Sequence, residues 1–252
     1  MSGKLTVVGL GPGDTRFLTP EASVALEAAE AVYGYGPYLD RVPTRAGQAR
    51  HASDNREELD RAGAALAHAA TGATIAMVSG GDPGVFAMAA AVIEAIEAGP
   101  AEWRTLELAV VPGITAMLAV AAKCGAPLGH DFCAISLSDN LKPWELIEKR
   151  LRLAAQAGFA MAFYNPVSKA RPHQLETAFD ILRAELPGTV PVIFGRAVGR
   201  ADERLRIVPL VNAHGHMADM ATCILVGSAE TRLVPRPGLP SLVYTPRHAG
   251  DV

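Results

Sequence analysis

The feature that most constrains the fold is an alternation, repeated along the first half of the chain, of short apolar runs, glycine-rich turns and helical stretches. Strands that alternate with helices form right-handed βαβ units, and such units build a parallel sheet. The pattern therefore predicts an N-terminal α/β domain. Its predicted strands are 5–8, 31–33, 74–78 and 106–111, and its predicted helices are 21–30, 53–70, 85–98 and 116–124.

Two of these helices begin at residues that are typical of helix starts. Thr19 stands before Pro20, which predicts an N-cap followed by a proline at the first helical position. Ser53 is the predicted N-cap of the helix that runs through Ala70 and is closed by Gly72.

The stretch "GAPLGHD" at 125–131 interrupts the alternation, so we predict a linker there between domains at 1–124 and 132–252. In the second domain, successive strand-like runs without a helix between them predict a mixed sheet. The proline-rich segment from residue 235 onward is expected to be extended or frayed. The predicted strands here are 132–136, 159–164, 190–194, 204–208 and 222–226, and the predicted helices are 144–157 and 173–185.

Composition excludes several classes of protein. A net charge of -3 gives no global basic field, so we expect no nucleic-acid partner. No apolar run approaches the roughly 18 residues of a membrane span, and the first residues lack a signal peptide's apolar core, so we expect a cytoplasmic protein without a membrane partner. The three cysteines are widely spaced and the "HGH" at 214–216 lacks a third ligand in sequence, so we expect no metal.

The turns that follow the predicted strands are the candidate ligand site, because open α/β sheets bind ligands at the carboxyl ends of their strands. The first turn does not fit the dinucleotide pattern, since Asp14 stands where the third glycine is required. Glycine and proline instead give rigid turns with exposed backbone, which suits a polar ligand held by main-chain groups. The turns are "GLGPGD", "YGYGPYLD", "SGGDPGVF", "VPGIT", "FYNPVSKAR" and "FGRAVGR".

Three of these motifs, "VVGLGPGDTRFLT", "SGGDPGVF" and "VPGITA", resemble the N-terminal motifs of the tetrapyrrole (cobalamin-precorrin) methyltransferases in order and spacing. The later "GAPLGHDFCAISLSDNLKPWE", "FYNPVSKAR" and "DMATCILVGSAETR" resemble the branch that methylates carbon 17 of precorrin-3B and contracts the ring to precorrin-4 in cobalamin biosynthesis. The resemblance implies a homodimer of two-domain α/β/α subunits, a mostly parallel first sheet and a mixed second one. It also implies S-adenosyl-L-methionine in the cleft between the domains.

The same resemblance implies the residues that hold this cofactor. Asp82 can accept hydrogen bonds from a ribose hydroxyl or from the methionine ammonium, and Phe163 can pack against adenine. The alternative for Phe163 and Tyr164 is ordinary strand core. The cofactor residues implied are Pro12, Gly81, Asp82, Val85, Phe86, Thr115, Ala116, Phe163, Tyr164, Asn165, Val198 and Thr222.

Methyl transfer from a sulfonium depends on alignment and exclusion of water, and it requires neither a metal nor an oxyanion hole. Ring contraction asks in addition for a general acid and base. We expect His130 to serve this role, with Ser136 and Asp139 behind it, because they lie in the segment most specific to the branch. The alternative for each is an ordinary linker or turn residue.

The implied tetrapyrrole substrate, precorrin-3B or cobalt-precorrin-3, carries several carboxylates, so positive charge is expected near the site. Arginine pairs well with carboxylates because its fork contacts both oxygens. Each basic side chain taken alone has the alternative of being a solvated surface charge. The candidates for substrate binding are Arg41, Arg45, Lys169, Arg171 and Arg196, with Arg50, Arg56 and Arg200 near them.

Other functions stay open at this point. A sister enzyme would methylate another carbon of a precorrin or cobalt-precorrin. The diphthamide or ribosomal-RNA branch of the fold would act on a macromolecule, and the RNA branch would have a more basic surface. A non-catalytic sensor of adenosyl ligands would bind the cofactor without turnover.

Overall fold

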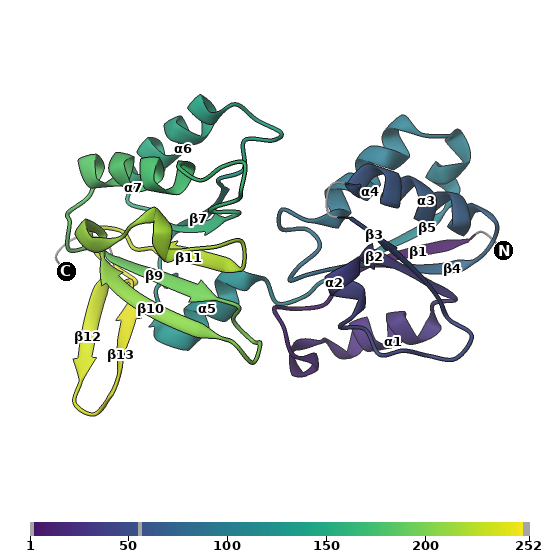
Figure 1. Ribbon diagram of the computed structural model, residues 1–252, viewed down its shortest axis with the longest axis horizontal. Coiled ribbons are helices and arrows are strands. Elements are labelled where there is room, and N and C mark those ends of the chain that lie inside the picture. Colours follow the sequence, from purple (N-terminus) through teal and green to yellow (C-terminus); the bar gives the residue numbers. More distant parts are fainter. Residues whose placement is uncertain (1–2, 55–56, 249–252) are drawn as a thin grey trace. The chain divides into compact units, whose positions relative to one another are not determined.

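The computed structural model describes residues 3–54 and 57–248, and these residues divide into two compact units, Met1–Ala116 and Met117–Val252 (Figure 1). We call them the N-terminal and C-terminal units. The boundary between the two units lies after Ala116, before the linker that the sequence predicted at 125–131. Helix α5 (Ala116–Cys124) therefore groups with the C-terminal unit, where Val120 lies against Gly195.

The N-terminal unit contains a five-stranded sheet in the order β3-β2-β4-β1-β5, and every pair of neighbours is parallel. This confirms the parallel α/β pattern that the alternation predicted. The strands are β1 (Lys4–Gly9), β2 (Ala31–Tyr35), β3 (Ala49–Ser53), β4 (Thr74–Ser79) and β5 (Glu107–Val111).

Helices cover both faces of this sheet (Figure 1). Neighbouring strand residues point to opposite faces, so Ile75 and Met77 pack with α3 (Glu58–Ala70) and α4 (Met88–Ala98), whereas Val78 packs with α1 (Pro20–Ala28) and α2 (Gly36–Leu39). Helix α1 begins as predicted, because the Thr19 hydroxyl accepts a hydrogen bond from the backbone N–H of Ala22 at 3.1 Å. Short 3-10 helices lie at Thr15–Phe17 and Ala101–Thr105.

The C-terminal unit contains a mixed sheet in the order β10-β9-β11-β8-β7, as predicted. Only β7 and β8 are parallel neighbours, and the other pairs are antiparallel. Its strands are β7 (Phe132–Ser136), β8 (Ala160–Tyr164), β9 (Pro191–Arg196), β10 (Arg204–Pro209) and β11 (Thr222–Val226).

Helices α6 (Trp144–Gln156) and α7 (Gln174–Glu185) share one core with this sheet, around Phe163, Phe179 and Phe194. Val120 of α5 contacts the sheet at Gly195, whose Cα carries no side chain to hold the helix away. Short 3-10 helices lie at Leu210–Asn212 and Gly215–Met217. Within the described residues, no helix combines the length and apolar character needed to cross a membrane.

One local prediction was incomplete and one was wrong. The proline-rich segment forms a hairpin of β12 (Arg232–Arg236) and β13 (Leu239–Tyr244), and β13 pairs with β6 (Gly125–Ala126). Ser53 ends strand β3 instead of capping a helix, and its hydroxyl accepts a hydrogen bond from Arg61 Nε at 2.7 Å. In both cases pairing with a distant strand overrides the local preference of the segment.

Candidate active site

The turns after β1 and β4 are locked together by backbone hydrogen bonds. Gly11 N donates to Gly81 O at 3.1 Å, and Gly81 N donates to Gly11 O at 2.9 Å. Both residues have positive φ, 66° and 68°, which glycine adopts without a steric penalty. The two motifs that the sequence singled out therefore form one rigid surface at the carboxyl edge of the N-terminal sheet.

The turn after β5 closes against the same surface. A Cβ on Gly113 would lie 2.2 Å from the carbonyl oxygen of Gly81, and a Cβ on Gly9 would lie 2.6 Å from Gly113 N. A Cβ on Gly81 would lie 3.7 Å from the Cα of Thr115, which is itself buried. The structure thus brings Gly81 and Thr115 together, and it explains why these turns need glycine.

Asp82 ties two of these turns to each other. Its Oδ1 accepts from Gly84 N at 2.8 Å, and its Oδ2 accepts from Gly113 N at 3.0 Å. An ionised carboxylate has about four acceptor positions, so Asp82 retains capacity for a ligand's donors. Val85 N donates to Asp82 O at 3.3 Å, and Pro12 and Ala116 are half-buried near the ends of their own turns.

Arg41 holds the turn after β1 through hydrogen bonds to its backbone carbonyls. Its Nη2 donates to Leu10 O and Gly11 O at 2.8 Å each, and its Nε donates to Gly13 O at 3.2 Å. The side chain is half-buried and committed to these carbonyls. The expected contact with a substrate carboxylate is therefore not supported by its placement, which is structural.

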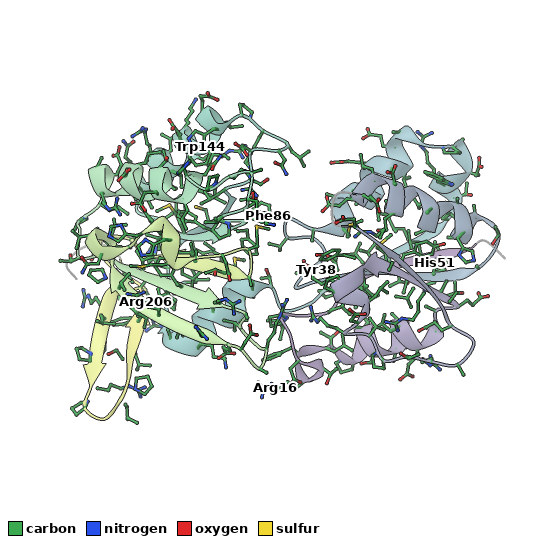
Figure 2. All side chains as sticks on the ribbon, viewed as in Figure 1. Arg16, Tyr38, His51, Phe86, Trp144 and Arg206 are labelled. Carbon is green, nitrogen blue, oxygen red and sulfur yellow. The ribbon has the colours of Figure 1, made fainter. Side chains whose placement is uncertain are left out.

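Strained backbone conformations occur in the turns that follow strands of both sheets. Among the described residues, the non-glycine residues with positive φ are Phe86 at 52°, Asn165 at 52° and Ala197 at 49°. They follow strands β4, β8 and β9 respectively. Strain of this kind costs about 1–3 kcal/mol and gathers at functional sites. Phe86 is 49% exposed on its loop (Figure 2).

In the C-terminal unit, the ends of β7 and β8 are joined by side chains. Asn165 Nδ2 donates to Ser136 Oγ at 3.0 Å, and Ser138 N donates to the same oxygen at 3.4 Å. Tyr164 accepts a hydrogen bond from Met117 N at its phenolic oxygen, at 3.0 Å. Ser136, Tyr164 and Asn165 thus come together, as expected for neighbouring parallel strands.

Arg171 is a buried support for this edge. Its Nη1 donates to Asn165 O at 3.0 Å and Leu137 O at 3.4 Å, and its Nε lies 3.7 Å from Asp139 Oδ1. Asp139 Oδ2 also accepts from Gln174 Nε2 at 3.2 Å. Because its side chain is only 8% exposed, Arg171 is not available as a surface ligand for substrate, contrary to expectation.

The same edge includes β9 and the start of β11, since Thr222 pairs with Arg196. Arg196 donates to Asp202 and Asp219, each at 2.7 Å, and these bonds raise the pKa of Arg196. Thr222 Oγ1 donates to Asp219 Oδ1 at 2.8 Å. Arg196 is thus already paired with two carboxylates, which weakens its predicted role as a substrate ligand.

Phe163 does not lie where the sequence placed it. Its side chain is fully buried in the core beneath α6 and α7, so its ring is not available to adenine. Val198 and Thr222 are also buried, and they can meet a ligand only through backbone or a small part of their side chains.

His130 is separated from Ser136 and Asp139. It precedes β7, whereas the other two lie at and beyond the end of that strand. A strand of five residues spans about 13–16 Å, so the three side chains form no single cluster. His130 Nδ1 instead accepts from Asp131 N at 2.7 Å.

The remaining basic candidates divide by their contacts. Arg45 donates to Glu27 O, and Arg50 donates to Leu39 O and to Val42 O, so both hold backbone turns. Lys169 and Arg200 are exposed, and Arg56 lies outside the described residues.

The "HGH" motif belongs to an ion-pair network. His214 Nδ1 lies 3.4 Å from Glu176 Oε1, and the rings of His214 and His216 stack with centroids 5.6 Å apart. Burial alone would raise the pKa of Glu176, but hydrogen bonds from Gly215 N and Arg183 outweigh it and lower the pKa. Among the residues that the structure describes, no group of three or more His, Cys, Asp or Glu side chains is arranged for a metal ion.

Two side chains at these edges were missed by the sequence analysis. Tyr38 lies against Gly80, where a Cβ would come within 2.7 Å of its ring (Figure 2). Lys142 lies in the loop between β7 and α6, where burial first and then the charges of Arg150 and Arg171 lower its pKa. The only sequence signal was their position inside the "GYGPYLD" and "SDNLKPWE" motifs.

Comparison with known proteins decides the family. Residues 4–213 match the family described as Tetrapyrrole (Corrin/Porphyrin) Methylases. This chain belongs to the tetrapyrrole methylase family. The family predicted from the motifs is thereby confirmed.

Two of the methylase relatives cover nearly the whole chain. One is the precorrin-3B C(17)-methyltransferase of Sinorhizobium sp, 66% identical over 98% of this chain and 97% of the relative. Another is the probable cobalt-factor III C(17)-methyltransferase of Salmonella typhimurium, 38% identical over 96% of this chain and 98% of the relative. The relatives are thus named as enzymes that methylate carbon 17.

A solved methylase structure agrees with the fold throughout. The methyltransferase CobJ matches with a TM-score of 0.93 and 54% identity over 97% of this chain and 100% of CobJ. Uroporphyrin-III C-methyl transferase from Thermus thermophilus, complexed with S-adenyl homocysteine, matches with a TM-score of 0.68 and 21% identity over 90% of this chain and 98% of that one. The second similarity concerns the fold alone.

Proposed function

We propose that this chain is an S-adenosylmethionine-dependent C-methyltransferase that methylates carbon 17 of precorrin-3B and contracts the ring to precorrin-4 in cobalamin biosynthesis. The observation that carries the proposal is its 66% identity with the precorrin-3B C(17)-methyltransferase of Sinorhizobium sp over nearly the full length of both chains. The lower identity, 38%, to the relative named for cobalt-factor III favours the cobalt-free precorrin as substrate.

The N-terminal turns fit the cofactor. The interlocked glycines present backbone without side chains, and Asp82 keeps spare acceptor positions for ribose hydroxyls or an ammonium group. Pro12, Val85, Phe86, Thr115 and Ala116 stand on the same turns. When bound, the cofactor supplies an electrophilic methyl group on sulfur. Its location between the two units stays a prediction.

The chain's own contribution to methyl transfer is alignment. The turns are held by backbone hydrogen bonds, by Asp82 and by Arg41, so they need little ordering when ligands bind. Rigid placement of two reactants supplies much of the catalysis in such a displacement. This is consistent with the two internal supports, the half-buried Arg41 and the buried Arg171, one at the edge of each sheet.

For the ring contraction, the structure favours Ser136 and Asp139 over His130. Ser136 Oγ accepts two hydrogen bonds, so its own proton is available to a ligand. Asp139 is held by Gln174 and Arg171 at the same edge. We assign the proton transfers to this pair.

The test is incubation of the purified chain with precorrin-3B and S-adenosylmethionine, followed by mass spectrometry. The proposal requires a product that carries one added methyl carbon and appears only with both compounds present. Binding of S-adenosylhomocysteine without any turnover would instead support a sensor of adenosyl ligands. The homodimer and the cytoplasmic location stay predictions, to be tested by light scattering and cell fractionation.

A further inference from the structure

Lys142 is a partly buried lysine of the C-terminal unit. It lies in the loop that leaves the carboxyl end of β7, two residues before α6 begins at Trp144, which is labelled in Figure 2. Its side chain is half-buried, and it makes no hydrogen bond or ion pair with any residue in 3–54 or 57–248. Burying part of a charged side chain without a counter-charge costs free energy.

Two other positive charges act on Lys142. Burial lowers the pKa of Lys142, and the guanidinium groups of Arg150 and Arg171 lower it further. The nearby carboxylate of Asp139 is engaged by Arg171 and Gln174. Helix α6 also begins without a side-chain cap, which leaves the positive end of its dipole at this loop.

We propose that Lys142 binds a carboxylate of the tetrapyrrole substrate and positions the macrocycle at the Ser136 edge of the C-terminal sheet. A substrate carboxylate would supply the counter-charge that no described residue provides to the ammonium of Lys142. The substrate carries such groups on its rim, whereas Arg41, Arg171 and Arg196 are committed to internal partners. This inference rests on the proposed function and names a substrate-binding residue for it.

The methionine carboxylate of the cofactor has the same chemistry as a rim carboxylate, so the experiment must separate the two. Lys142→Gln removes the charge, and Lys142→Arg restores it. Lys149→Gln is the matched control, because Lys149 lies exposed on α6 and the charge change is identical. For each full-length variant, kcat and KM for precorrin-3B, the Kd for S-adenosylhomocysteine and the melting temperature are measured.

We expect Lys142→Gln to raise the KM for precorrin-3B about tenfold, equivalent to about 1.4 kcal/mol, with kcat and the Kd for S-adenosylhomocysteine within about twofold of wild type. Its melting temperature should equal or exceed that of wild type, because the unpaired charge is gone. Lys142→Arg should recover most of the KM, and Lys149→Gln should change nothing.

Three results would overturn the inference. The first is an unchanged KM in Lys142→Gln, or one raised equally by Lys149→Gln. The second is an effect confined to S-adenosylhomocysteine binding, which would place the cofactor carboxylate at Lys142. The third is a fall in melting temperature, which would make Lys142 a structural residue. An inactive wild type would refute the proposed function itself, which is a separate outcome.

Discussion

The role of Arg41 gives the sharpest test of how the N-terminal turns are held. Arg41→Met removes three hydrogen bonds from a guanidinium to the carbonyls of Leu10, Gly11 and Gly13. Each bond to a charged group is worth about 1.5–3 kcal/mol when buried, but Arg41 is half-buried and water can reach part of the site. The energies of three bonds made by one side chain also do not add up in full. We therefore expect Arg41→Met to lower the free energy of unfolding of the N-terminal unit by about 2–3 kcal/mol.

The assay can isolate that unit. The chain has two tryptophans, Trp103 and Trp144, one in each unit. In a Trp144→Phe background, urea unfolding followed by fluorescence reports on Trp103 alone. Arg104→Met is the control, because Arg104 is exposed and, within the part of the chain that the structure describes, donates one hydrogen bond, to Glu97 O.

We expect Arg41→Met to lower the urea midpoint and to weaken S-adenosylhomocysteine binding, since the first turn loses its support. Arg104→Met should leave both nearly unchanged. If Arg41→Met kept wild-type stability and cofactor affinity but raised the KM for precorrin-3B, the reasoning would fail. Arg41 would then be the substrate ligand that the sequence suggested.

Further predictions concern other parts of the chain. Asp82→Ala should weaken S-adenosylhomocysteine binding by about 1–3 kcal/mol in calorimetry, because it frees Gly113 N as well as losing a ligand acceptor; unchanged affinity would exclude Asp82 from the site. Phe163→Ala should cost about 3–5 kcal/mol of stability, since it opens a cavity in the core; a small loss with a large cofactor effect would restore its ligand role. The lowered pKa of Glu176 means that its contribution to stability is present at neutral pH and is lost as pH falls through that folded-state pKa. Glu176→Gln should therefore be less stable than wild type near neutral pH, and the difference should vanish in acid denaturation curves. Burial raises the pKa of Cys223 to about 12, so iodoacetamide should label it only after unfolding; rapid labelling of the folded chain would contradict its burial.

Much of the fold could be predicted from local pattern. Helix α5 and strands β7 and β11 have the bounds that the sequence indicated, because each is a mostly apolar run between clear turn residues. The missed strands β3, β12 and β13 are mostly exposed and carry charges or prolines. They become strands only because a partner strand lies beside them, which periodicity along one segment does not reveal.

The candidate site, like the fold, was predictable in part. Glycine spacing identified the turns that meet around Gly81, because close backbone approach demands glycine at fixed places. The arginines were harder to assign, since sequence cannot distinguish a guanidinium that binds a ligand from one that binds a carbonyl. Arg41 and Arg171 bind backbone carbonyls, and only burial and contacts revealed that Lys142 has no partner among the described residues. His130 was grouped with Ser136 and Asp139 by sequence, but strand β7 separates it from them in space.

The central claim is that this chain methylates carbon 17 and contracts the ring. The most direct measurement is NMR of the product formed from precorrin-3B and S-adenosylmethionine labelled with carbon-13 in its methyl group, with carbon-13 spectra reporting the transferred methyl and proton spectra reporting the unlabelled acetyl methyl. The account predicts one labelled methyl signal, on the quaternary carbon 17, together with the acetyl group extruded by ring contraction. A label on another carbon, or methylation without the acetyl signal, would contradict it.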